Sequence, residues 1–430
     1  MSTVTNNLRK IENSFSQNLK VGWFLAKRDI KRGSLGTTAL IVSVMTLTFL
    51  NLVVVSGILI GLIQGSEDAQ KRYAIGDIVI SSFLNRSYIE QTPEVVNIVK
   101  TVPGYKNHAV RYTASARIEA NYRKTVKPGE LRDGAGGSFL GIDPVQEEKF
   151  SGISQFIMRG SFLEAGDQDK VVLGKNLLYE FTPIEAPGFQ TLKDISIGSR
   201  VKITVGKISK EYIVKGIVGS KVDTFDTSII ALDSEVRKMS GRNDLNANEI
   251  AIQLLPGTDP VVAQQFILNS GAGEFARVQT AEEAFPKFLK DIKATFGILG
   301  SAISGIGLVV ASITIFIVIF VNAITRRRYI GILKGIGINQ RAILYSYMLQ
   351  ALIYASLGTT IGIIVLFVFL KPYFAANPID FPFSDGILVA TLSGTMMRAG
   401  ILLFATIIAG YIPARIVIRQ NTLSAILGRS

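Results

Sequence analysis

The sequence predicts a membrane protein with four transmembrane α-helices and a large α+β extracytoplasmic domain of two lobes between the first and second spans. Two observations carry this prediction. Four apolar stretches are long enough to cross a bilayer, and most charged residues lie outside them. The long segment between the first two stretches is hydrophilic and mixes strand-like with helix-like patterns.

The first three spans contain no charged side chain. Their uncharged runs lie between Arg32 and Glu67, between Lys293 and Arg326, and between Arg341 and Lys371. Each exceeds the roughly 20 residues needed to cross a hydrocarbon core about 30 Å thick. The fourth apolar run, from Ile387 to Ile412, is interrupted by Arg398. We expect this side chain to reach the outer surface of the membrane, with a functional charge as the alternative.

The basic excess lies beside the spans and predicts the topology. The formal net charge is +13, yet residues 65–293 hold 29 basic and 29 acidic residues, and the rest of the chain holds 17 and 4. This distribution argues against nucleic acid as a partner. By the positive-inside rule, both termini and the 325–341 loop are cytoplasmic and the large domain is outside. We therefore expect a multi-pass protein of the cell (inner or cytoplasmic) membrane.

The predicted boundaries follow the chain in order. Residues 1–33 form a cytoplasmic amphipathic helix, in which Trp23 and nearby lysines suit a lipid interface. The remaining segments are span one (34–64), the outer domain (65–280, with an inserted β-rich lobe at roughly 140–245), a stalk continuous with span two (281–324), a cytoplasmic loop (325–341), span three (342–370), a short outer loop (371–386), span four (387–413) and a cytoplasmic tail (414–430).

The residues offer no catalytic centre. The sequence has no G-x-x-x-x-G-K-[ST] loop for ATP phosphates, no H-E-x-x-H and no G-x-S-x-G. There is no cysteine, and the one histidine, His108, lies in a strand-like stretch, where a structural role is expected. We expect no enzyme activity, no metal and no cofactor in this chain.

Small residues recur at helical spacing in three spans. Four-residue spacing places them on one helix face, where helices approach closely, either within the chain or at a dimer interface. They are Gly57, Gly61 and Gly65 in span one, Gly297, Ser301 and Gly305 in span two, and Gly358 and Gly362 in span three.

The cytoplasmic loop is unusually apolar for a connection between two spans. Ile330, Ile332, Leu333 and Ile336 are expected to form the apolar face of a short helix flanked by Arg328 and Lys334. Such a helix either lies on lipid or docks into a groove on a soluble partner.

This loop resembles the cytoplasmic signature of FtsX-like permeases, the group that includes MacB and LolC, in which R-x-x-E-I-G-I-L-K/R-A-I-G-A follows the second span. The closing stretch, residues 411–428, is similar to the family's P-A-R motif with a later A-L pair, carried here by Pro413, Ala414, Arg415, Ala425 and Ile426. Two positions depart from the signature: Tyr329 replaces the glutamate and Gly335 the alanine. The tail also lacks the arginine that usually follows A-L.

The resemblance implies a permease subunit of an ABC transporter, working by mechanical coupling across the membrane. The loop would be a coupling helix that contacts a separate ATPase subunit, where ATP and Mg²⁺ bind. Its contact residues would be Arg327, Arg328, Tyr329, Ile330, Gly331, Ile332, Leu333, Lys334, Gly335, Ile336 and Gly337.

The family also implies further partners: a second permease chain (the same or a different one), membrane lipid, and a lipoprotein, periplasmic adaptor or cell-wall hydrolase. The cargo would be a lipoprotein, lipid, peptide or hydrophobic compound. Two alternatives remain open at this point: a regulator that activates an extracellular cell-wall hydrolase, and a membrane receptor or scaffold without an ATPase.

Overall fold

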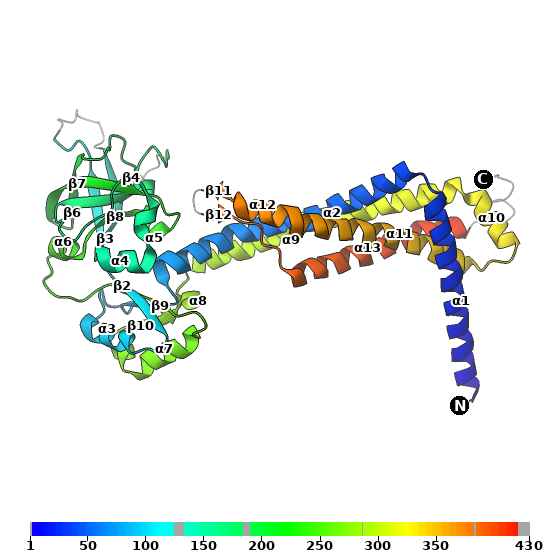
Figure 1. Cartoon of the computed structure of the whole chain (residues 1–430), viewed down its shortest axis with the longest axis horizontal. Coiled ribbons are helices and arrows are strands. Elements are labelled where there is room, and N and C mark those ends of the chain that lie inside the picture. Colours follow the sequence, from blue (N-terminus) through cyan, green and yellow to red (C-terminus); the bar gives the residue numbers. More distant parts are fainter. Residues whose placement is uncertain (1, 124–132, 184–189, 286, 382–383, 420–430) are drawn as a thin grey trace. The chain divides into compact units, whose positions relative to one another are not determined.

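The structure is a computed structural model that describes residues 2–123, 133–183, 190–285, 287–381 and 384–419 (Figure 1). The chain divides into two compact units. The helical unit comprises Met1–Leu62, Asp291–Ile379 and Gly386–Ser430, and the sheet unit comprises Ile63–Lys290 and Asp380–Asp385.

Four helical segments of the described chain are long and apolar enough to cross a membrane: Leu35–Ile75, Lys290–Thr325, Gln340–Ala376 and Leu392–Ile418. The first consists of α2 (Leu35–Ala69) and a π-helix (Gln70–Ile75), and the second lies in α9 (Lys287–Thr325). The third joins α11 (Gln340–Ile364), a π-helical stretch (Val365–Leu370) and α12 (Lys371–Ala376). The fourth is α13 (Leu392–Ile418). Together with the sheet unit, they confirm the predicted fold class.

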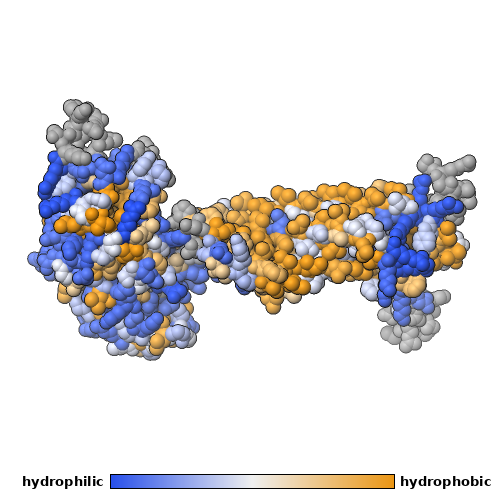
Figure 2. All heavy atoms as spheres, turned by 45° about the horizontal axis from the view of Figure 1, so that its top comes forward, coloured by the Kyte–Doolittle hydropathy of each residue, from blue (hydrophilic) through white to orange (hydrophobic). Residues whose placement is uncertain are grey.

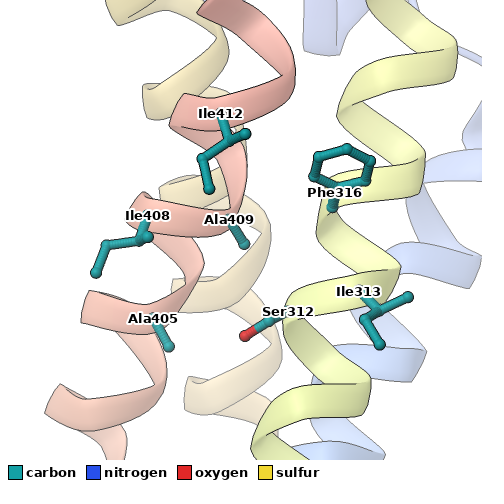
Figure 3. A pocket seen from close by; sticks show the side chains of 7 residues that line it. All are labelled: Ser312, Ile313, Phe316, Ala405, Ile408, Ala409 and Ile412. Carbon is teal, nitrogen blue, oxygen red and sulfur yellow. The ribbon is translucent and has the colours of Figure 1, made fainter.

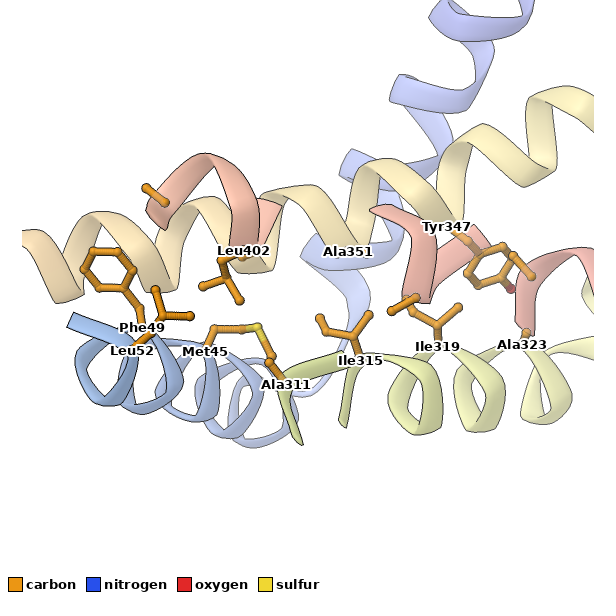
Figure 4. Packing of buried hydrophobic residues seen from close by; sticks show 14 of the residues in the cluster. Met45, Phe49, Leu52, Ala311, Ile315, Ile319, Ala323, Tyr347, Ala351 and Leu402 are labelled. Atoms are coloured by element: carbon orange, nitrogen blue, oxygen red, sulfur yellow. The ribbon is translucent and has the colours of Figure 1, made fainter. Parts of the chain in front are cut away.

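The helices of the helical unit pack around a continuous apolar core. Figure 4 shows Met45 of α2 close to Ala311 of α9, with Leu402 of α13 nearby, and Phe49 and Ile315 belong to the same core. On the outside, the spans expose mostly apolar side chains, as expected for surfaces that contact lipid (Figure 2). Hydrophilic residues gather at the end of this unit where α1 (Ser2–Arg32) and α10 (Arg327–Gly335) lie.

The limits of two spans differ from the prediction. Span four begins at Leu392 rather than at 387, because Thr391 caps the helix by accepting a hydrogen bond from the Gly394 amide. The helix also continues through Pro413 to Ile418, beyond the predicted end at 413. Span three continues past 370, because the helix carries on through α12.

The predicted continuous stalk is wrong at one point. A short helix, α8 (Ala281–Ala284), ends at Phe285, whose ψ of 126° is extended. The residue before a proline is biased against helical geometry, and Pro286, itself outside the described residues, follows. The long helix α9 then begins at Lys287 and runs without interruption to Thr325.

The N-terminal helix α1 packs against α11. A Cβ atom at Gly22 would lie 3.0 Å from the backbone oxygen of Ala342, so a larger residue would push the two helices slightly apart. Phe15 meets Tyr345 edge to face, and Ala26 is fully buried. Trp23 and Phe24 remain exposed, as expected of a helix at a lipid interface.

The sheet unit contains a ten-stranded mixed sheet with the order β10-β1-β9-β2-β3-β8-β5-β7-β4, and β6 pairs with β2 and β7. The strands are β1 (Ile78–Ser81), β2 (Tyr105–Glu119), β3 (Gly134–Ile142), β4 (Ile157–Gly160), β5 (Lys170–Gly174), β6 (Arg200–Val205), β7 (Ile208–Val218), β8 (Ser228–Leu232), β9 (Glu249–Leu254) and β10 (Arg277–Thr280). The helices are α3 (Thr92–Lys100), α4 (Pro144–Ser151), α5 (Asp223–Asp226), α6 (Asp233–Met239) and α7 (Pro260–Asn269), with α8 after β10.

Strand β2 belongs to both lobes. Its first half, to Arg111, pairs with β9, and its second half, from Tyr112, pairs with β3. The inserted lobe therefore begins within β2, not at about residue 140 as predicted, because β3 and the second half of β2 are part of its sheet. One apolar core lies under α3 and α7, and two more lie on either side of the β3-β8-β5 region.

Candidate functional site

The 325–341 loop, predicted to be cytoplasmic, contains a short helix, α10, between α9 and α11. After Ile336 the backbone turns at Gly337, whose φ of 91° suits glycine. The amide of Gly337 donates to the oxygen of Lys334, and that of Ile338 donates to the oxygen of Leu333. Asn339 then caps α11 by accepting from the amide of Arg341. The G-I-G-I-N segment thus closes one helix and starts the next.

The apolar residues of α10 and of Ile336, which follows it, divide into a covered and an exposed group. Ile330 and Leu333 are buried in the core of the helical unit, at 3% and 8% exposure. Ile332 and Ile336, at 47% and 70%, are exposed together with Tyr329. The predicted single apolar face is therefore wrong, because the bundle covers one side of the helix.

This division separates the predicted contact residues into covered and exposed ones. The buried Ile330, Gly331 and Leu333 are not accessible to a partner. Arg327 and Lys334 are partly buried. We define the exposed residues as the docking face: Arg328, Tyr329, Ile332, Gly335, Ile336 and Gly337.

Polar contacts fix α10 at both of its ends. Nη1 of Arg326, which precedes the helix, lies 2.7 Å from Oδ1 of Asp29 in α1. The other Asp29 oxygen accepts a hydrogen bond from Gln350 of α11 at 3.1 Å. At the far end, Nζ of Lys334 donates to the backbone oxygen of Ile418 in α13, and burial lowers the pKa of this ammonium group. The docking face is thus held by α1, α11 and α13.

Sequence reasoning missed Asp29 and Gln350. Asp29 did carry a signal, since it is the sole acidic residue in the basic 20–32 segment. Its partner Arg326 lies nearly 300 positions away, so the pairing itself could not be read from one sequence.

The small-residue positions have three different environments. Gly358 and Gly362 face α2, where a Cβ would lie 2.5 Å from atoms of Met45 and Phe49. Gly57 and Gly61 instead admit the extended segment before α13, because a Cβ at Gly61 would overlap the oxygen of Ile387. In α9, Gly297 and Gly305 face open space, with Ser301 exposed between them, and Gly65 lies partly buried in α2.

The structure describes the first three residues of the C-terminal P-A-R motif. Pro413 and Ala414 are buried in α13, and Arg415 is exposed with its guanidinium over the ring of Tyr411. Ala425 and Ile426 lie outside the described residues.

In the sheet unit, Arg111 is the largest fully buried side chain. Its guanidinium is 2.7 Å and 3.0 Å from the two oxygens of Glu147 in α4, and 3.0 Å from Glu249 in β9. Its Nη1 also donates to the oxygen of Ala74, in the π-helix that ends the first span segment. Burial opposes the charge, but the two glutamates outweigh it and raise the pKa of Arg111.

The one histidine of the sheet unit belongs to a buried hydrogen-bonded group. His108 is buried, with Nδ1 2.6 Å from the hydroxyl of Tyr105 and Nε2 3.2 Å from the amide of Gln146. Among the described residues, no group of three or more histidine or acidic side chains could hold a metal ion.

The C-terminal part of the chain matches a family of known proteins. Residues 301–422, which include α10, match the model of the FtsX-like permease C-terminal family. The macrolide export ATP-binding/permease protein MacB of Campylobacter jejuni is 22% identical over 291 residues, covering 64% of this chain and 43% of that relative. This chain thus spans less than half of that protein's length.

Two further similarities cover other shares of the chain. An uncharacterised ABC transporter permease of Methanocaldococcus jannaschii is 22% identical over 344 residues, covering 78% of this chain and 79% of the relative. The periplasmic region of MacB from Actinobacillus actinomycetemcomitans aligns with 48% of this chain and 88% of its own, at a TM-score of 0.33 and 14% identity.

Proposed function

Because the chain is an FtsX-like permease of the MacB type, we propose that it is the membrane subunit of an ABC transporter whose ATP is hydrolysed on a separate subunit. The MacB relatives are named as joint ATP-binding and permease proteins, whereas this sequence contains no phosphate-binding G-x-x-x-x-G-K-[ST] loop. ATP and Mg²⁺ would bind to the partner.

The observation that carries the proposal is the docking face of α10. Tyr329, Ile332 and Ile336 expose apolar surface on a helix between two membrane spans, next to the charged Arg328. An apolar patch with a charged rim is typical of a surface that docks a partner. Since Tyr329 replaces the family glutamate, the contact would depend on apolar packing rather than on an ion pair at this position.

The ties of α10 support mechanical coupling. Arg326 and Lys334 connect the ends of the helix to α1 and α13, and Ile330 and Leu333 insert into the bundle core. A displacement of the docking face would therefore move these helices rather than bend a free loop.

Two long helices would carry this movement away from α10. The helix α9 has 39 residues, so it is about 58 Å long, almost twice the thickness of a hydrocarbon core. The segment Leu35–Ile75 has 41 residues and is of similar length. Movement of α10 would pass along both helices to the domain outside the membrane, which would act on the cargo.

The proposed topology has α10 and both termini in the cytoplasm and the sheet unit outside. It rests on the excess of Lys and Arg beside α10 and in α1. The chain would work with a second permease chain, which the open small-residue face of α9 (Gly297, Ser301 and Gly305) could meet. The cargo would be a lipoprotein, lipid, peptide or hydrophobic compound.

The sequence contains no cysteine, so single-cysteine variants can test both the topology and the docking of the ATPase subunit. Ile336→Cys lies on the docking face, and Val262→Cys lies on an exposed face of α7. In intact cells, a membrane-impermeant maleimide should label Cys at 262 but not at 336; the reverse pattern would overturn the topology. In opened membranes, added nucleotide-binding subunit should protect position 336 and leave 262 reactive. Equal reactivity of position 336 with and without the subunit would overturn the docking assignment.

A further inference from the structure

Arg398 is held between membrane helices, and the described residues give it no acidic partner. It lies in α13, six residues or about 9 Å after the helix begins, and its Nη2 donates to Oγ of Ser56 in α2 at 2.7 Å. No described carboxylate lies within ion-pair distance of Arg398. A hydroxyl satisfies one of the five guanidinium hydrogens and leaves the charge uncompensated. Since a charged group in a membrane span is costly, an anion is the expected companion.

The anchor of Arg398 is a rigid part of the helical unit. Ser56 is 4% exposed, and a Cβ on Gly300 of α9 would lie 3.4 Å from its Cα, so α2, α9 and α13 converge here. The neighbouring Gly57 accepts a hydrogen bond from the amide of Val389, which fixes the segment before α13. This packing holds Ser56 in place, and its hydroxyl restrains the arginine. The sequence prediction favoured a side chain that reaches the membrane surface, with a functional charge as the alternative.

An apolar groove lies further along the same face of α13. It is lined by Ser312, Ile313 and Phe316 of α9 and by Ala405, Ile408, Ala409 and Ile412 of α13 (Figure 3). Steps of seven residues bring Arg398, Ala405 and Ile412 onto one line of the helix. On α9, the residues that line the groove follow Gly305, two turns earlier in the helix, which faces open space.

The dimensions of this surface suit one class of ligand. Along α13, Ala405 lies about 10 Å from Arg398, and half of a hydrocarbon core is about 15 Å thick. A lipid with its headgroup at Arg398 would therefore place its acyl chain in the groove. The guanidinium fork matches the oxygens of a phosphate.

We propose that Arg398, Ser56 and the groove between α9 and α13 form a binding site for an anionic phospholipid of the outer leaflet. The guanidinium binds the headgroup phosphate, and the acyl chain lies between Ser312 and Phe316 of α9 and the small side chains of Ala405 and Ala409. The site does not depend on the docking of an ATPase.

The test uses the full chain, purified in neutral detergent and titrated with phosphatidylglycerol or phosphatidylcholine while bound lipid is counted by native mass spectrometry. We expect saturable binding of phosphatidylglycerol, with phosphatidylcholine at least about tenfold weaker. Arg398→Gln should remove this preference, and Arg398→Lys should keep part of it. Ala405→Leu should weaken binding by filling the groove, whereas Gly400→Leu, a matched change facing open space on the same helix, should not.

Several results would overturn the proposal. Unchanged selectivity in Arg398→Gln would exclude the arginine, and unchanged affinity in Ala405→Leu would exclude the groove. Displacement of bound lipid by millimolar inorganic phosphate would mean that the site recognises a free anion. A lipid-free dimer that Ala405→Leu dissociates would show that a second copy of the chain fills the groove. Because no ATPase is present, none of these results depends on the proposed function.

Discussion

Two arginine-centred contacts, one in each unit, fix helix ends in opposite ways. In the sheet unit, Arg111 and Glu147 are each 1% exposed, and the arginine also binds a backbone oxygen of the π-helix. In the helical unit, the side chains of Arg326 and Asp29, beside α10, are 30% and 18% exposed. Breaking a buried pair leaves an uncompensated charge, whereas a partly solvated pair can open at little cost. The comparison suggests that the sheet unit is rigid and that α10 can be displaced.

The largest effect is expected at the buried pair. Glu147→Ala leaves the guanidinium of Arg111 without its bidentate partner and should lower the free energy of unfolding by about 3–5 kcal/mol. Glu180→Ala, which breaks the exposed pair with Arg159, is the matched control and should lower the free energy of unfolding far less. Chemical denaturation monitored by circular dichroism measures the free energy of unfolding of both variants. Equal losses would remove the distinction between buried and exposed pairs.

The two faces of α10 should differ in stability as well. Leu333→Ala removes a buried side chain from the bundle core and should cost about 2–5 kcal/mol. Ile332→Ala, the same kind of change on the docking face, should stay within about 0.5 kcal/mol of the unchanged chain. Thermal unfolding in detergent, detected by size-exclusion chromatography, compares the two variants. If Ile332→Ala were the more damaging one, the assignment of the faces would be reversed.

The tie at Asp29 should affect coupling more than stability. Asp29→Asn removes the charge opposite Arg326 but keeps a group that can hydrogen-bond to Gln350, so stability should change by about 1 kcal/mol at most. Partner-stimulated ATP hydrolysis should continue, with a weaker link between hydrolysis and transport. The ratio of the two rates is the measurement, and an unchanged ratio would show that the tie has no part in coupling.

The smallest effect concerns pH. Burial, followed by the charge of Lys100, lowers the pKa of His108 below its ordinary value of about 6.5. The unfolded chain therefore binds more protons below that pH, and the sheet unit should lose stability as the pH falls from about 7 to 5. In His108→Gln this part of the pH dependence should disappear. A parallel loss in both proteins would assign the effect to other groups.

The parts of the fold that sequence reasoning predicted are those with a local signal. Uncharged runs that begin after Arg32, Lys293 or Arg341 predict membrane spans because hydrocarbon excludes charge. This signal does not depend on how the helices pack against one another. The strand-like and helix-like patterns of the hydrophilic segment likewise depend on neighbouring residues, and the structure contains strands and helices there, as in β1-α3-β2 and β9-α7-β10.

What sequence reasoning missed depends on contacts between distant residues. Ile330 and Ile332 are equally apolar, and only the packed bundle decides which of them is covered. The stretch from 387 to 390 is apolar enough for a span, yet it is extended because Gly57 and Gly61 leave room for it beside α2. The partner of Arg111 lies 36 positions away, beyond the reach of any periodic pattern.

The central claim is that the exposed face of α10 docks an ATPase subunit. The most direct measurement is ATP hydrolysis by the purified nucleotide-binding subunit, with and without the chain carrying Ile332→Asp. A charge placed in an apolar contact should abolish stimulation while the variant still inserts and folds. Val262→Asp, an equally drastic change on the exposed surface of α7, should stimulate like the unchanged chain. Full stimulation by Ile332→Asp would contradict the account.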